Sequence, residues 1–252
     1  MRPLRNAYAA MLLLLATISW ASPWFLPRFL APTTLGVLPV VAAIAGASSA
    51  FTPARKTLAH VSTFVHELAH CVAAVAVGAS PRRITYQPDA TGLAILEFPE
   101  RVGRLRRSLV LLAGYLGPGI GAGVVLAGVL AGRPRETVVV LAVTAVGALV
   151  LLVRNLWGAG VTALLALIAS ASARALPDVG VEILLAFLSG MLTALGVRDT
   201  WEQFRFREPG DCDAGAVARE LPVLPWRWIA GAQLLAALAL TGLGGALIFR
   251  AI

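Results

Sequence analysis

Charged residues are scarce in this chain of 252 residues. They make up 13% of it, hydrophobic residues make up 58%, and the mean hydropathy is +0.81. Soluble domains average roughly 25% charged and 45 to 50% apolar residues. A composition this poor in charge excludes an ordinary soluble domain and indicates an integral membrane protein.

Cysteine is scarce too, and the basic residues are scattered. The two cysteines, Cys71 and Cys212, are too few for a disulfide framework, and their spacing forms no metal-binding pair. The net charge of +8 comes from basic residues in short loops and at helix ends, without a basic face that could read nucleic acid. This pattern argues against nucleic acid as a partner and fits a lipid bilayer.

Long apolar runs set the fold class. A helix needs about 17 to 25 residues to cross the hydrocarbon core of a bilayer. Windows near this length lie at 7–22, 34–51, 57–78, 105–131, 137–153, 159–176, 180–197 and 226–249. We therefore predict an all-α polytopic membrane protein of roughly six to eight transmembrane helices, in one domain over residues 1–252. The first window is predicted to be a retained helix, because "SWASPWF" is a poor signal-peptide cleavage site.

A polar segment after the third window predicts a small β-hairpin. Ile84, Tyr86, Leu93 and Ile95 flank the turn signal "QPDATG". The exposed edge of a hairpin cannot lie in lipid, so the hairpin must rest at the interface or be covered by protein. The surrounding loop is rich in arginine, which predicts a cytoplasmic position by the positive-inside rule. These residues are Arg82, Arg83, Arg101, Arg104, Arg106 and Arg107.

His66, Glu67 and His70 spell H-E-x-x-H within one apolar window. Four residues advance an α-helix by about 400°, which places both imidazoles on one face, close enough to share a tetrahedral Zn²⁺. Glu67 then lies beside the metal, where it can take a proton from zinc-activated water as that water attacks a peptide carbonyl. This composition predicts roughly 0.001 chance matches to the motif. Polar groups in a membrane segment are costly, so we interpret the cluster as functional.

Three segments together carry a family resemblance: "FVHELAH", the hairpin "VAVGASPRRITYQPDATGLAI" and the glycine-rich "LLAGYLGPGIGAG". They resemble the site-2 protease family of zinc intramembrane metallopeptidases, and most closely a compact actinobacterial branch of it. The resemblance implies a catalytic core over about 57–245, with accessory spans at about 7–51. It also implies one zinc ion per chain and cleavage of a membrane-embedded or membrane-associated protein or peptide. His66 and His70 would be the ligands and Glu67 the base.

The third zinc ligand is less evident. The family's usual ligand is the aspartate of a Leu-Asp-Gly motif, and this tripeptide is absent from the chain. The segment "CDAGAVAREL" is similar to a Ser-Asp-Ala run of the same branch, which favours Asp213, with Asp199 and Asp211 as alternatives. Asp211 or Asp213 could instead cap a helix that begins near Ala214.

Asn155 is a neutral amide among apolar neighbours. In longer members of the family an asparagine near the third ligand helps to bind the substrate or the oxyanion, so Asn155 is a candidate for that role. The competing interpretation is an interfacial Arg-Asn pair that ends a helix.

Four glycines in the span that follows the hairpin predict close helix packing. Gly117 and Gly121, and likewise Gly119 and Gly123, have small-xxx-small spacing. Pro118 lies among them and predicts a kink.

Two rival functions remain open. A non-catalytic scaffold or regulator derived from the same family would keep the motif without the third ligand, although the intact Glu67 favours an enzyme. A metal transport protein would place polar residues on several spans, whereas spans other than 57–78 carry almost none. We predict a zinc metalloendopeptidase of the cell membrane with its catalytic loops toward the cytoplasm.

Overall fold

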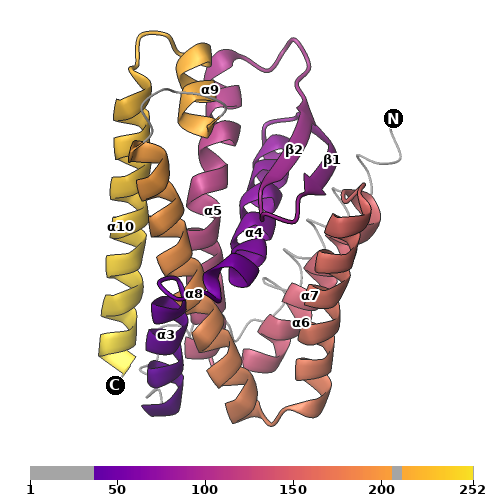
Figure 1. The fold of residues 1–252 in the computed structure, drawn as a ribbon, viewed down its shortest axis with the longest axis vertical. Helices are drawn as coiled ribbons and strands as arrows, with labels where there is room; N and C mark the ends of the chain where they lie inside the picture. Colours follow the sequence, from indigo (N-terminus) through magenta and orange to yellow (C-terminus); the bar gives the residue numbers. More distant parts are fainter. Residues whose placement is uncertain (1–36, 206–211, 252) are drawn as a thin grey trace.

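The computed structural model describes residues 37–205 and 212–251 of the chain. This part folds into eight α-helices and one two-stranded antiparallel sheet (Figure 1). The predicted fold class, helical with a hairpin after the H-E-x-x-H helix, is confirmed. The predicted span at 7–22 and the candidate Asp211 lie outside the described residues.

Five of the described helices are long and apolar enough to cross a membrane. They are α4 Arg55–Ala76, α5 Arg104–Leu130, α6 Pro134–Leu151, α7 Leu156–Ala175 and α8 Asp178–Arg205. Two more helices, α3 Val37–Ser49 and α10 Trp226–Ala251, coincide with the predicted windows at 34–51 and 226–249. The eighth, α9 Asp213–Glu220, is short and precedes α10. Every predicted window within the described residues therefore forms a helix.

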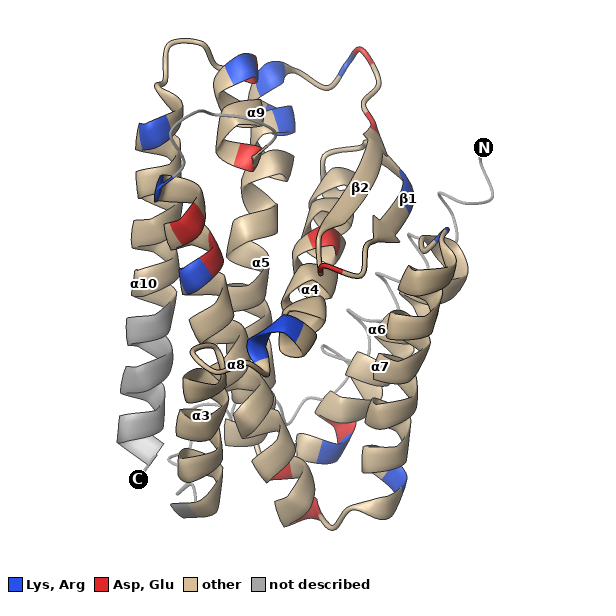
Figure 2. Ribbon diagram, in the orientation of Figure 1, with Lys and Arg blue, Asp and Glu red and all other residues tan. Residues whose placement is uncertain are grey.

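The helices form a bundle with α4 near its centre (Figure 1). α4 packs on α5, α5 packs on α8, α3 and α10 pack on α8, and α6 pairs with α7. Charged residues gather mostly toward the two ends of the bundle, while long stretches of α5, α6 and α7 between the ends carry none (Figure 2). This distribution fits an apolar middle layer that lies in lipid.

Glycines end the helices next to the hairpin and next to α6. After α4, Gly78 adopts φ 83°, a left-handed conformation typical of a helix C-terminus, and the chain turns directly into the first strand. After α5, Gly132 adopts φ 65° and leads into Pro134, the first residue of α6. The first of these turns places the hairpin immediately beside the helix that carries H-E-x-x-H.

The hairpin consists of β1 Ser80–Tyr86 and β2 Gly92–Glu97. Its turn is closed by Asp89, whose Oδ1 accepts hydrogen bonds from the N–H and the hydroxyl of Thr91 at 2.9 and 2.7 Å. The outer edge of β1 is covered, because Ile84 donates its N–H to the carbonyl of Leu152 and accepts the N–H of Arg154. The predicted hairpin is confirmed, and one of its two edges is paired within the protein.

Glycines also bring helix backbones together. A Cβ atom on Gly117 would lie 2.6 Å from a side-chain carbon of α4, and one on Gly121 would lie 3.1 Å from another. Gly119 faces α10 instead, and a Cβ on Gly123 would meet no atom of the described residues within 4 Å. Close packing is thus confirmed for the first pair and for Gly119 but not for Gly123. α5 continues through Pro118 as one helix.

The backbones of α3 and α8 approach each other closely at two glycines. A Cβ on Gly46 would lie 2.0 Å from the carbonyl oxygen of Phe187, and a Cβ on Gly190 would lie 2.0 Å from that of Ala43. Real Cβ atoms essentially never come this close to another heavy atom, so the two helices touch only because both positions are glycine.

Gly190→Ala should therefore force α3 away from α8. Overpacking of this kind costs about 1 to 3 kcal/mol, so we expect a lower midpoint of thermal unfolding in detergent. Gly123→Ala is the matched control, since it adds the same methyl group to open space and should leave the midpoint unchanged or slightly higher. Equal midpoints for the two variants would contradict the packing described here.

Candidate metal centre and active site

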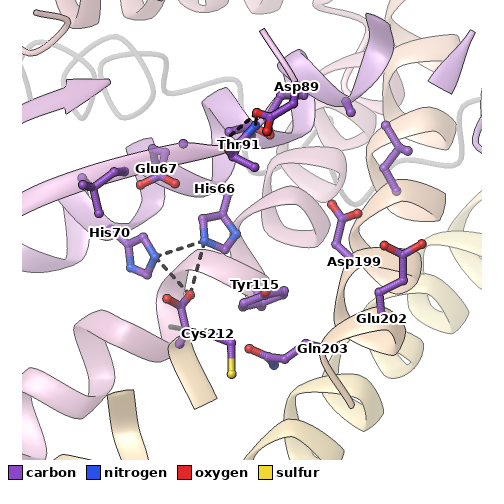
Figure 3. Close-up of a pocket in the computed structure, with 18 of the residues that line it drawn as sticks. His66, Glu67, His70, Asp89, Thr91, Tyr115, Asp199, Glu202, Gln203 and Cys212 are labelled. Atoms are coloured by element: carbon purple, nitrogen blue, oxygen red, sulfur yellow. Dashed lines mark hydrogen bonds and ion pairs between the residues drawn. The ribbon is translucent and has the colours of Figure 1, made fainter. Parts of the chain in front are cut away.

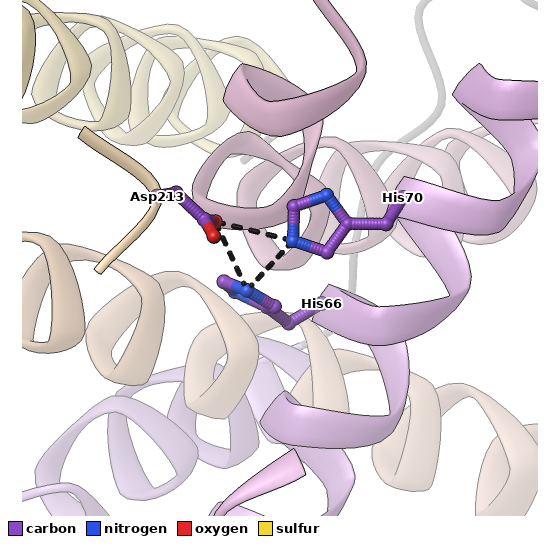
Figure 4. A group of neighbouring side chains, drawn as sticks. All are labelled: His66, His70 and Asp213. Carbon is purple, nitrogen blue, oxygen red and sulfur yellow. Dashed lines mark hydrogen bonds and ion pairs between the residues drawn. The ribbon is translucent and has the colours of Figure 1, made fainter. Parts of the chain in front are cut away.

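The two histidines of α4 face the same point. His66 and His70 lie one helical turn apart, and their Nε2 atoms are 3.2 Å from each other. Asp213, the first residue of α9, completes the group: its Oδ2 lies 3.3 Å from Nε2 of His66 and 3.1 Å from Nε2 of His70 (Figure 4). Two distant segments of the chain therefore bring two nitrogens and one oxygen together.

The size of this triangle fits a zinc ion. Zinc binds histidine nitrogen and carboxylate oxygen at about 2.0 to 2.1 Å, so two ligands of a tetrahedral site lie about 3.3 Å apart. The three observed separations are 3.1, 3.2 and 3.3 Å. Asp213 Oδ2 is also buried without a correctly directed hydrogen bond from any described residue. A buried oxygen of this kind calls for a partner that the side chains around it do not supply.

The chemistry of the donor set points the same way. Nδ1 of His70 lies 2.8 Å from the carbonyl oxygen of Val110, and a hydrogen bond donated to that carbonyl leaves the lone pair of Nε2 free. Burial by itself raises the pKa of Asp213, but the two imidazoles beside it outweigh burial and hold the pKa below its ordinary value. Two imidazole nitrogens and one carboxylate oxygen form a donor set that zinc accepts, so the three residues together could hold a metal ion.

The other aspartates predicted as ligands are placed differently. Asp199 of α8 lines the same cleft but is not part of the metal-binding group, and it accepts a hydrogen bond from Ser62 at 3.2 Å. Asp211 is outside the described residues. α9 begins at Asp213, and its N-cap residue is Cys212, whose side chain makes no capping hydrogen bond. The Asp213 side chain thus faces the histidines, as the metal-ligand prediction requires.

Glu67 is buried beside the metal-binding group, with 5% of its surface exposed. The hairpin lies directly against it: a Cβ on Gly92 would come 2.7 Å from Glu67 Oε1. Thr63, one turn earlier on α4, donates its hydroxyl to the carbonyl of Ala90 at 2.6 Å and holds the turn of the hairpin in place. The carboxylate is therefore enclosed between α4 and the start of β2.

A cleft of about 1090 Å³ opens onto these groups. Its walls come from α4, the hairpin, α5, α8 and the start of α9, and His66, Glu67 and His70 point into it together with Asp199 and Glu202 (Figure 3). Charged and polar side chains within a membrane bundle are tolerated where they line a cavity that water can enter. The cleft is large enough to admit an extended peptide segment beside the metal-binding group.

Two residues of α5 belong to the site although the sequence analysis does not single them out. A Cβ on Gly114 would lie 2.3 Å from Nε2 of His70 and 2.6 Å from Nε2 of His66, so only glycine leaves room for both imidazoles. The ring of Tyr115 packs edge-on to His66 with centroids 4.8 Å apart and lines the cleft. Gly114 belongs to the glycine-rich stretch "LLAGYLGPGIGAG". The spacing of glycines in this stretch predicts helix packing and gives no sign of a role at the histidines.

Asn155 lies against the hairpin and is not among the residues that line the cleft. Its Oδ1 accepts the N–H of Tyr86 at 3.1 Å, and its Nδ2 donates to the carbonyl of Tyr86 at 2.6 Å. The side chain thus imitates a strand backbone at the outer edge of β1. Cys71, which follows His70, is buried in an apolar cluster with Phe64, Ile84 and Leu152.

Gly114→Ala should damage the metal centre selectively. The added methyl group must displace the imidazoles, so we expect zinc affinity to fall at least about tenfold. Gly117→Ala is the control, because its methyl group would crowd α4 one turn further along without reaching either imidazole. Zinc affinity is measured by competition with a chromogenic chelator, and equal loss in both variants would show that general helix displacement is responsible.

The comparison with known families follows the same segments. A family model described as "Peptidase M50B-like" matches residues 37–243, which include His66, Glu67, His70 and Asp213. No curated protein and no solved structure matches the chain. The narrower assignment to an actinobacterial branch stays a prediction. Because the match covers most of the sequence, the chain belongs to the peptidase M50B-like family, within the site-2 protease family that its motifs resemble.

Proposed function

We propose that this protein is a zinc-dependent intramembrane metalloprotease that hydrolyses peptide bonds of a membrane-embedded or membrane-associated protein. One observation carries the proposal: a buried carboxylate, Glu67, lies beside a His66, His70 and Asp213 triangle of zinc dimensions, at the wall of a cleft within the helical bundle. Family membership supports the same conclusion, since this is a family of peptidases.

The residues divide the chemistry among them. His66, His70 and Asp213 would hold a zinc ion, which would supply Lewis acidity toward water and the scissile carbonyl. Glu67 accepts the proton of the attacking water and then delivers it to the leaving amine. The close approach of Gly92 to Glu67 limits the space that is open to the carboxylate.

The hairpin is suited to present the substrate. Gly92, Leu93, Ala94 and Leu96 of β2 line the cleft, whereas the outer edge of β1 is already paired with residues 152–154. An extended peptide can add to a free strand edge by main-chain hydrogen bonds, and a peptide must be extended to be cleaved. We therefore assign β2 the role of pairing with the substrate, and Asn155 the role of anchoring the opposite edge.

The orientation in the membrane follows from the arginines. The first turn of α5 carries Arg104, Arg106 and Arg107. This end of α5 lies at the same end of the bundle as α9, where further basic residues gather (Figure 2). The positive-inside rule places this end in the cytoplasm, so the proposed enzyme is a multi-pass cell-membrane protein with its catalytic loops on the cytoplasmic side.

Elemental analysis of the detergent-purified protein tests the metal centre. We expect about one zinc per chain in the wild type and in Glu67→Gln, loss of zinc in His66→Ala, and a reduced content in Asp213→Ala, because only ligands should matter. Absence of zinc from folded wild-type protein would favour a non-catalytic scaffold. Transport would instead appear as zinc uptake into proteoliposomes.

Glu67→Gln tests catalysis separately from binding. The amide cannot accept a proton, so cleavage of a membrane-anchored reporter peptide in vesicles should slow about 10² to 10⁴-fold while zinc stays bound. Glu202→Gln is the matched control, because Glu202 is an exposed carboxylate at the far side of the same cleft, paired with Arg198. A Glu67→Gln variant that cleaves at the wild-type rate would contradict the proposed base.

Strand addition is tested by cross-linking. In an inactive Glu67→Gln background, a cysteine introduced at Leu93 on β2 should form a disulfide with a cysteine scanned through the reporter peptide. Thr85→Cys provides the control, because Thr85 is the β1 residue directly paired with Leu93 and lies on the strand whose outer edge is covered. Equal cross-linking from both positions would argue against pairing along β2.

A further inference from the structure

Two glutamine side chains are buried between helices of the bundle. Gln203 of α8 has 0% of its surface exposed and Gln233 of α10 has 2%. Nε2 of Gln203 donates to Oε1 of Gln233 at 2.6 Å, which joins the two helices. Amide side chains inside a membrane bundle are costly to bury, so a pair of them indicates a task beyond packing.

The oxygen of the Gln203 amide accepts a hydrogen bond from the first turn of α9. Oε1 of Gln203 accepts the backbone N–H of Ala214 at 3.3 Å, and Ala214 directly follows Asp213. The N–H groups in the first turn of a helix have no partner within that helix, and a side chain at the N-cap usually accepts one of them. In α9 the N-cap side chain, Cys212, makes no such bond. Gln203 supplies it from a different helix.

This capping bond matters because α9 is short. A helix of eight residues is not stable by itself and depends on its contacts. Cys212, Ala214 and Val217 pack against Ile229 and Ala230 of α10, and such apolar packing is not directional. A hydrogen bond to the first turn is directional, and it restricts how that turn can rotate.

We propose that Gln203, held in place by Gln233, is a positioning residue that fixes the first turn of α9 and so aims the Asp213 carboxylate at His66 and His70. The relay runs through three elements: α10, α8 and the start of α9. Gln203 and Cys212 both line the cleft that contains the site (Figure 3). The inference rests on the proposed metal centre and assigns no chemistry to the glutamines themselves.

The test measures zinc affinity of the full-length protein in detergent, by competition with a chromogenic chelator. Gln203→Met keeps the volume of the side chain but removes both hydrogen bonds, and the zinc dissociation constant should rise about 10- to 100-fold. The matched control is Ser189→Ala. Ser189 is also buried on α8 and donates an interhelical bond, to the carbonyl of Ala122 at 3.0 Å, but it lies about four helical turns from Gln203. Its dissociation constant should change by less than about threefold.

A conservative variant separates positioning from general stability. Gln203→Glu keeps an oxygen for the Ala214 N–H. Nε2 of Gln233 is buried without a partner among the described residues, so this amide can turn over and donate to the new carboxylate. Zinc affinity should return to near the wild-type value. The visible absorption of bound Co²⁺, which reports coordination geometry, should be altered in Gln203→Met and normal in Gln203→Glu and Ser189→Ala.

The outcomes distinguish this inference from the proposed function. If the wild-type protein binds zinc and Gln203→Met has the same zinc dissociation constant, the positioning role is overturned and the metal centre is still supported. Wild-type protein that binds no zinc would overturn both. If Gln203→Met does not fold, Gln233→Met decides: a dissociation constant raised at least about threefold above that of Ser189→Ala supports the relay, and an equal one overturns it.

Discussion

Ionisable side chains inside an apolar bundle must be given partners, and the arrangement of this protein follows from that constraint. Burying an unpaired charge costs several kcal/mol or more, so His66, His70 and Glu67 can share a membrane-spanning helix only where other elements satisfy them. A backbone carbonyl of α5 orients His70, the first residue of α9 brings a carboxylate to both imidazoles, and the hairpin covers Glu67. α5, α9 and the hairpin thus each contribute something to one small site.

Glycines, which lack a side chain, leave the room that these groups need. Protein interiors are close-packed, so a cluster of imidazoles requires missing atoms on the surfaces that face it. Gly114 on α5 and Gly92 on β2 leave that space on two sides of α4, for the histidines and for Glu67 respectively. Gly117 and Gly121 bring the same face of α5 close to α4 further along. Glycine in this protein therefore serves the site as well as helix packing.

The edges of the hairpin need hydrogen-bond partners within a membrane bundle. Unpaired backbone groups cannot face lipid, and the two strands would leave two edges in need of partners. Residues 152–154 and the Asn155 amide satisfy the edge of β1, while residues of β2 line the cleft. Among the described residues, no other strand pairs with the outer edge of β2, which lies beside the reactive groups. In the proposed function this strand edge, which would favour aggregation elsewhere, is the place where an extended peptide pairs.

The amino-acid sequence by itself determined the features that depend on near neighbours in the chain. Apolar length predicted the helices, the turn signal at "QPDATG" predicted the hairpin, and helical periodicity placed His66 and His70 on one face. Tertiary structure alone decided the rest. Asp213, Asp199 and Asp211 could not be separated by spacing, because their distance from α4 depends on how α8, α9 and α10 pack. Asn155 and Gln203 likewise reveal their partners, Tyr86 and Ala214, only after folding. No local pattern encodes contacts between segments 11, 69 or 137 residues apart, as for Gln203, Asn155 and Asp199, since helix packing in three dimensions creates them.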